Sequence, residues 1–151
     1  MSRWAIIAVI ALLSACTGFN QLQANYLQGQ SASSADADVV FVRAVATGEQ
    51  TWTFHVTVQH PDTGWEDYAD GWDVVLPDGT PILVNANDPF TRLLLHPHTP
   101  EPFTRSQSNI RIPADVTIVR VRAHDLVDGW GGQEITLDLT QPEGEGYTVE
   151  R

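Results

Sequence analysis

An alternation of apolar and polar side chains over residues 51–59 constrains the fold more than any other feature of the sequence. Threonines, a histidine and a glutamine separate the apolar positions Trp52, Phe54, Val56 and Val58. Successive side chains of a β-strand point to opposite faces of its sheet, so a period of two indicates a strand with one buried face. An amphipathic helix would repeat its apolar residues every three to four positions. The segment therefore predicts a half-buried strand.

Further short strands are expected along the chain, separated by turn-forming residues such as Pro77-Asp78-Gly79. Besides 51–59, they cover residues 39–45, 72–76, 81–85, 91–96, 109–112, 116–123 and 134–139. Seven or eight short strands without a helical period predict an all-β domain built as an antiparallel β-sandwich. We expect this domain to span residues 38–140, followed by a flexible Gly/Glu-rich tail over 141–151.

The C-terminal part of this domain resembles a known family. Residues 112–123, followed by Asp128-Gly129-Trp130-Gly131-Gly132, resemble the last two strands of a fibronectin type III domain. The resemblance implies an immunoglobulin/fibronectin III-like sandwich, although Thr117 stands where that fold places its corner tyrosine. Residues 64–72, 96–105 and 122–132 are also similar to a group of small exported bacterial proteins of unknown function, which implies a location but no activity.

The N-terminus has the features of a secretion signal. Arg3 precedes an apolar run over residues 4–13, which ends at Leu13-Ser14-Ala15-Cys16. These four residues resemble the lipobox of bacterial lipoproteins, which implies removal of residues 1–15 and attachment of lipid (palmitate among the chains) at Cys16. An ordinary secretory signal is the alternative. Residues 16–37 are predicted to form a flexible tether, so we expect an exported protein that is anchored to the cell envelope. In an organism with two membranes, Thr17 favours the outer membrane.

The charge of the chain limits its partners. Nineteen acidic residues face eight basic ones, which gives a formal net charge of -11. Such a chain is not expected to bind nucleic acid, whose phosphates attract basic surfaces. We expect contact with the membrane through the lipid, and an envelope protein or small ligand of unknown identity as the further partner. Cys16 is the single cysteine, so no intramolecular disulfide is expected.

His96 and His98 form the first candidate site. On a regular strand, residues two apart project from the same face, which we expect to be exposed to solvent here. With Glu101 they offer three ligands for Zn²⁺ or Cu²⁺. Alternatively, Pro97 makes this segment a rigid edge strand or turn, in which the histidines only cap exposed backbone groups and bind no metal. A fourth ligand would depend on the fold bringing one of three residues close, namely His60, His124 or Asp125.

The loop before residue 72 forms the second candidate site. Its carboxylates could supply oxygen ligands to Ca²⁺, although their spacing does not fit an EF-hand. Its aromatic residues could form an exposed platform for a sugar or peptide, with burial in the core as the alternative. The candidate loop-binding residues are Trp65, Glu66, Asp67, Tyr68 and Asp70.

Catalytic motifs of high specificity are missing from the sequence, which has no nucleophile elbow, P-loop or zinc-protease helix motif. We therefore expect no enzyme and no cofactor other than the possible Cu or Zn. The sequence predicts a non-catalytic binding or structural module at the envelope, with metal binding through His96 and His98 as the alternative.

Overall fold

A computed structural model describes residues 36–151, and its regular secondary structure is entirely β. The predicted signal peptide, the lipobox and all but the last two residues of the predicted tether lie outside these residues. The described part of the chain contains no helix long and apolar enough to cross a membrane. The strands are β1 (Asp38–Ala46), β2 (Thr51–Gln59), β3 (Ala69–Val75), β4 (Arg92–Leu93), β5 (Phe103–Arg111), β6 (Ile118–Asp125), β7 (Gly129–Trp130), β8 (Ile135–Asp138), β9 (Glu143–Gly144) and β10 (Tyr147–Glu150).

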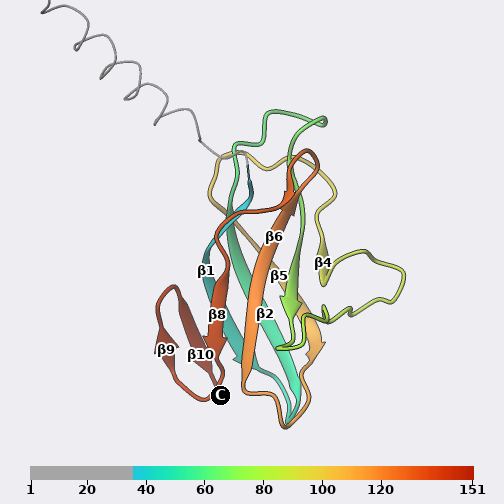
Figure 1. The fold of residues 1–151 in the computed structure, drawn as a ribbon. Coiled ribbons are helices and arrows are strands. Elements are labelled where there is room, and N and C mark those ends of the chain that lie inside the picture. The colour runs from blue at the N-terminus through green and yellow to red at the C-terminus, as the bar shows by residue number, and fades with distance from the viewer. Residues whose placement is uncertain (1–35) are drawn as a thin grey trace, which may run out of the picture. The chain divides into compact units, whose positions relative to one another are not determined.

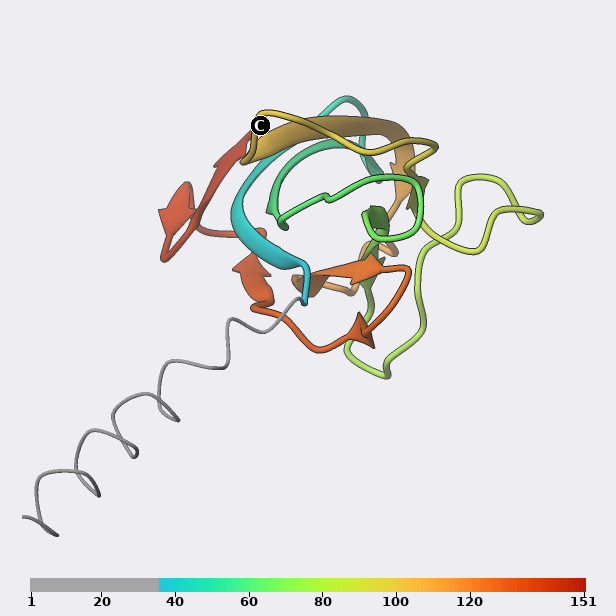
Figure 2. The same ribbon diagram turned by 90° about the horizontal axis from the view of Figure 1, so that it is seen from above.

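The strands form two sheets that lie on opposite sides of one core (Figures 1 and 2). One sheet has the order β5-β2-β1-β10-β9, and the other has the order β4-β3-β6-β7 with β8 also paired to β6. The strand pairs are antiparallel except that β10 runs parallel to β1. The prediction of an all-β fold is confirmed.

The core lies between the two sheets and follows the period of two seen in the sequence. On β2, every second side chain is buried, and the four apolar residues expected to face inward are 4% exposed or less. On β6, Val119, Val121 and Ala123 meet them from the other sheet. Trp72 on β3 is completely buried. Burying an aromatic or aliphatic side chain of this size contributes about 1.5–3 kcal/mol, so this alternation is a main source of stability.

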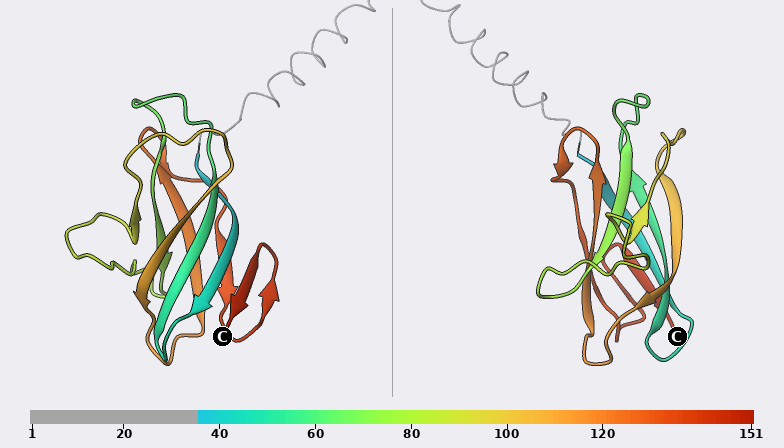
Figure 3. Two further views of the ribbon diagram at one scale, coloured as in Figure 1. Left: turned by 180° about the vertical axis from the view of Figure 1, so that it is seen from behind. Right: turned by 90° about the vertical axis from the view of Figure 1, so that its right-hand side faces the viewer.

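Two predicted strands are wrong over most of their length. Residues 81–85 form only an isolated bridge between Pro81 and Val75, and the strand expected over 91–96 is reduced to β4. Near Thr91, side-chain oxygens accept hydrogen bonds that backbone carbonyls would accept in a regular strand pair. Thr91 Oγ1 accepts a bond from Val74 N, and Asp73 Oδ1 accepts one from Thr91 N, both at 2.9 Å. The residues between Pro81 and β4 form a loop that projects from the sheet (Figure 3).

The prediction of a flexible tail over residues 141–151 is also wrong. β10 adds to the sheet beside β1, with Val42 opposite Tyr147, and it buries Tyr147 and Val149. The hydroxyl of Tyr147 accepts a bond from Asp138 N at 3.2 Å. Arg151 donates to the carbonyl of Leu139 at 2.9 Å, so the last residue described is also held. Two buried side chains and a set of strand pairs fix this segment.

Candidate metal centre

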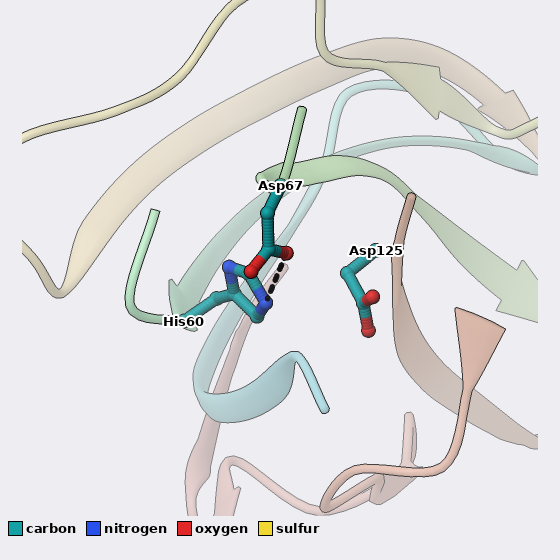
Figure 4. A group of neighbouring side chains, drawn as sticks. All are labelled: His60, Asp67 and Asp125. Atoms are coloured by element: carbon teal, nitrogen blue, oxygen red, sulfur yellow. Dashed lines mark ion pairs between the residues drawn. The ribbon is translucent and has the colours of Figure 1, made fainter. Parts of the chain in front are cut away.

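The strand register brings three titratable side chains together at one end of the sheets. β3 pairs antiparallel with β6, and Ala69 at the start of β3 lies opposite Asp125 at the end of β6. Asp67 comes two residues before β3, and His60 follows β2 directly. The β2–β3 loop, which holds His60 and Asp67, therefore lies against the end of β6, and both residues come close to Asp125 (Figure 4).

The three side chains have the spacing of ligands around one ion. Each offers a ligand atom within 4.8 Å of the other two, and His60 Nε2 lies 3.6 Å from Asp67 Oδ1. His60 and Asp125 are fully buried, whereas the Asp67 side chain is 27% exposed. Two ligands bonded tetrahedrally at about 2.1 Å to the same Zn²⁺ would lie about 3.4 Å apart. The distance between His60 and Asp67 is close to that value.

Each of these residues directs an unpaired polar atom into the site. His60 Nε2, Asp67 Oδ1 and Asp125 Oδ2 are buried and have no hydrogen-bond partner. A buried polar group left unpaired costs about 1–3 kcal/mol, and more when it is charged. Two neighbouring carboxylates also repel each other when both are ionised. A divalent cation would relieve both costs by accepting electron pairs from all three atoms.

Asp62 fixes the orientation of the His60 ring. Its Oδ1 lies 2.7 Å from His60 Nδ1 and also accepts a bond from Ala69 N, while its Oδ2 accepts one from His98 N at 2.6 Å. With Nδ1 donating to this carboxylate, a neutral imidazole carries its lone pair on Nε2, which faces Asp67. Carboxylates hydrogen-bonded to metal-binding histidines in this way orient the ring and raise its basicity.

Asp125 is held by the hairpin between β6 and β7. Its Oδ1 accepts bonds from Val127 N at 2.9 Å and from Asp128 N at 2.6 Å, which leaves Oδ2 free of hydrogen bonds. Asp125 also belongs to a second group, with Asp36 and Asp128, whose ligand atoms lie within 4.8 Å of one another. The second group offers oxygen atoms alone, and Asp128 in it is exposed. The imidazole and the three unpaired atoms make His60, Asp67 and Asp125 the better candidate.

The other predicted metal ligands do not converge. His98 is buried and its ring stacks between those of His96 and Phe103, with centroid distances of 4.5 and 4.1 Å. Burial lowers the pKa of His98, and the positive charge of Arg105 and then His96 add to this effect, while Asp62 opposes it. The expectation that both histidines face solvent from a regular strand is wrong for His98. Pro97 and the cis bonds before Pro100 and Pro102 belong to an irregular loop.

Glu101 is exposed, and within residues 36–151 the groups spaced to hold a metal include neither it nor His96 and His98. His96 Nδ1 lies 2.9 Å from the carbonyl of Pro97, so this ring is engaged with its own loop. The stacked rings, with Arg105, line a cavity of about 320 Å³.

The five loop residues predicted to bind a ligand separate into different environments. Asp67 joins the candidate metal centre, and Asp70 pairs with His124 Nδ1 at 2.6 Å. Glu66 is exposed, and Trp65 is 68% exposed with its ring edge-to-face against Tyr68. Burial in the core, which we considered as an alternative for the aromatic residues of this loop, therefore does not apply to Trp65.

Sequence reasoning named the three residues of the metal centre but did not group them. His60 and Asp125 were considered only as additional ligands for His96 and His98, and Asp67 only as part of a calcium loop. The available signal was the His60-Pro61-Asp62 sequence directly after a predicted strand, because an acidic residue two positions from a histidine can orient its ring. Asp125 could be added only once β3 and β6 were known to pair.

Comparison with known proteins gives one relative. A protein of Halomicrobium mukohataei named "Putative lipoprotein" is 37% identical over 121 residues, which cover 73% of this chain and 56% of the relative. The chain is similar to a lipoprotein. It spans about half the length of that relative. No family model and no solved structure matches the chain.

Proposed function

We propose that this protein is an envelope lipoprotein whose β domain binds a divalent metal ion without catalysing a reaction. Two features support the anchor: the Leu13-Ser14-Ala15-Cys16 sequence and the similarity to a protein named as a lipoprotein. Lipid chains on Cys16 would hold the protein stably only if two or more are attached, since a single chain binds a bilayer marginally. In a cell with two membranes, Thr17 after the cysteine favours the outer one.

Replacing the acylated cysteine tests the anchor. The Cys16→Ser variant, expressed as the full chain, should lose palmitate labelling and leave the membrane fraction. A matched Ser14→Ala variant alters the neighbouring sequence but keeps the thiol, and should stay in the membrane fraction. Retention of Cys16→Ser in membranes would contradict the anchor.

The observation that carries the metal proposal is the convergence of three buried atoms without hydrogen-bond partners, from His60, Asp67 and Asp125. One imidazole with two carboxylates suits borderline ions such as Zn²⁺, whereas Ca²⁺ and Mg²⁺ prefer sites made of oxygen alone. Protein ligands in three positions leave a further position for water or a partner's side chain. This ligand set replaces the earlier alternative of His96, His98 and Glu101 as the metal site.

A binding role is favoured over a catalytic one by the position of the site. His60 and Asp125 are fully buried, and of the three side chains that of Asp67 alone is partly exposed, at 27%. A substrate would therefore have little access to the ion. A buried ion bonded to Asp67 and Asp125 would instead join the β2–β3 loop to the β6–β7 hairpin.

Isothermal titration of the full-length protein with Zn²⁺ tests this function. Binding at one site is expected for the wild type, and the Asp67→Asn variant should lower the affinity about 100-fold or more because it removes a charged ligand. Glu66→Gln is the matched control, since this neighbouring side chain is exposed and outside the site. Equal affinity in Asp67→Asn and Glu66→Gln would reject the site.

The strand order supports assignment of the domain to the immunoglobulin/fibronectin III-like sandwiches. β1, β2 and β5 share one sheet, and β3, β6 and β8 share the other. These positions correspond to strands A, B, E and C, F, G of such domains. The β9–β10 hairpin adds a parallel neighbour to β1 and lies outside this pattern.

A further inference from the structure

Apolar side chains are exposed at the end of the domain that holds the metal centre. Trp65 in the β2–β3 loop is 68% exposed, and Leu126 and Val127 at the tip of the β6–β7 hairpin are 45% and 62% exposed. Isolated apolar residues are common on protein surfaces, whereas a contiguous group of them often marks an interaction site. These residues therefore indicate an interaction site only if they form one continuous surface.

Tyr68 joins the two segments into one surface. Its ring lies edge-to-face against Trp65, with centroids 6.2 Å apart, and its carbonyl accepts a hydrogen bond from Leu126 N at 3.2 Å. The loop and the hairpin lie together at the same end in Figure 1. We refer to Trp65, Tyr68, Leu126 and Val127 as the apical patch.

The described chain begins next to this patch. The Asp36 carboxylate lies within 4.8 Å of those of Asp125 and Asp128, which immediately flank Leu126 and Val127. Cys16 and Asp36 are 20 positions apart in the sequence, so even a fully extended chain would place them no more than about 70 Å apart. A lipid attached to Cys16 would therefore hold the bilayer within reach of the end that carries the patch.

We propose that the apical patch contacts the bilayer that holds the lipid anchor, with Trp65 and Val127 in the zone between headgroups and acyl chains. This inference rests on the proposed lipid attachment at Cys16. Tryptophan and tyrosine are enriched at membrane interfaces, where the ring is apolar and its polar atom remains hydrated. Because the anchor raises the local concentration of lipid, a weak contact suffices.

The charge around the patch defines the kind of bilayer. Glu66 and Asp128 are exposed beside the apolar residues and repel anionic headgroups. The patch therefore fits a zwitterionic surface. Leu83 and Leu95 are also exposed apolar residues, but no observation connects them with the start of the described chain. Leu83 consequently provides a control.

Quenching of tryptophan fluorescence by brominated lipid tests the contact. The full-length lipidated protein is reconstituted in phosphatidylcholine vesicles with bromine on the acyl chains. The wild type should be quenched, and Trp65→Phe should lose most of that quenching. Trp130→Phe, which changes a residue packed against Phe90 and Arg122, and Leu83→Ser should both retain it.

The outcomes separate the anchor from the patch. Failure of the wild-type protein to sediment with vesicles overturns the lipid anchor and this inference with it. Sedimentation with equal quenching in wild type and Trp65→Phe overturns the contact alone. If Trp65 is shielded from aqueous iodide but not quenched by bromine, the patch binds protein, including a second copy of the chain, and the bilayer contact is wrong.

Discussion

Two histidine clusters in this molecule differ in how the neighbouring side chains hold the imidazole rings. At the candidate metal centre, Asp62 holds the His60 ring so that Nε2 faces two further carboxylates. In the irregular loop after β4, His96 and His98 lie ring against ring at 4.5 Å, with Phe103 beyond them. The first arrangement directs lone pairs to one point. The second uses imidazoles as flat packing surfaces.

The comparison shows that short sequence spacing is a poor guide to ligand convergence. His96 and His98 are two positions apart, yet they form no group of three close ligand atoms with another described residue, although Asp62 Oδ2 lies 3.9 Å from His98 Nδ1. His60 and Asp67 are seven positions apart in the β2–β3 loop, whereas Asp125 is distant in sequence and is brought to them by the pairing of β3 with β6. Convergence of all three thus depends on strand register as well as on proximity along the chain.

Removal of one histidine from each cluster should give the largest difference in affinity for Zn²⁺. His60→Ala is expected to lower the affinity for Zn²⁺ about 100-fold or more, since it removes the only imidazole ligand. His96→Ala should leave the affinity unchanged. Isothermal titration measures both, and circular dichroism shows whether each variant folds. Because His60 is buried, His60→Gln provides a second variant of similar size, and zinc binding as tight as wild type in both His60 variants would remove this residue from the site.

Loss of the carboxylate that orients His60 should have an intermediate effect. Asp62→Asn leaves one acceptor oxygen where the carboxylate uses two, so we expect a decrease in Zn²⁺ affinity of about 10–100-fold. Asp70→Asn is the matched control, because Asp70 pairs with His124 outside the metal centre. If both variants bind zinc equally, the ring orientation does not depend on Asp62.

The smallest expected effect concerns the stacked cluster and pH. The pKa of His98 is lowered from 6.5 in the fold, mainly by burial, so the unfolded chain takes up a proton that the folded chain does not. The free energy of unfolding should therefore fall as the pH drops through 6.5 towards the lower folded pKa, and level off below it. Thermal unfolding of metal-free protein at a series of pH values measures this dependence.

His98→Phe should make this pH dependence shallower, because it keeps an aromatic ring between His96 and Phe103 but has no proton to exchange. Thr99→Ser, a substitution in the same loop that changes no titratable group, should retain the wild-type dependence. If the free energy of unfolding of His98→Phe depends on pH as steeply as that of the wild type, the stacked rings do not oppose protonation of His98.

The fold was more predictable than the site because strand formation leaves a local pattern. The alternation over residues 51–59 predicted the bounds of β2 and its buried face. The strands predicted over residues 81–85 and 91–96 are wrong over most of their length because side chains of Asp73 and Thr91 substitute for strand pairing. A local sequence pattern does not reveal such hydrogen bonds. β10 was missed because its two buried side chains, Tyr147 and Val149, gain their partners from a strand at the other end of the chain.

By itself, the sequence determined the all-β class, the inward face of β2 and the acidic balance of the chain. These properties follow from side-chain chemistry and a period of two residues, both of which are local. The tertiary structure alone decided that His60, Asp67 and Asp125 share a site and that His98 packs against Phe103. Such contacts depend on strand register and loop path, which are fixed by burial across the whole core.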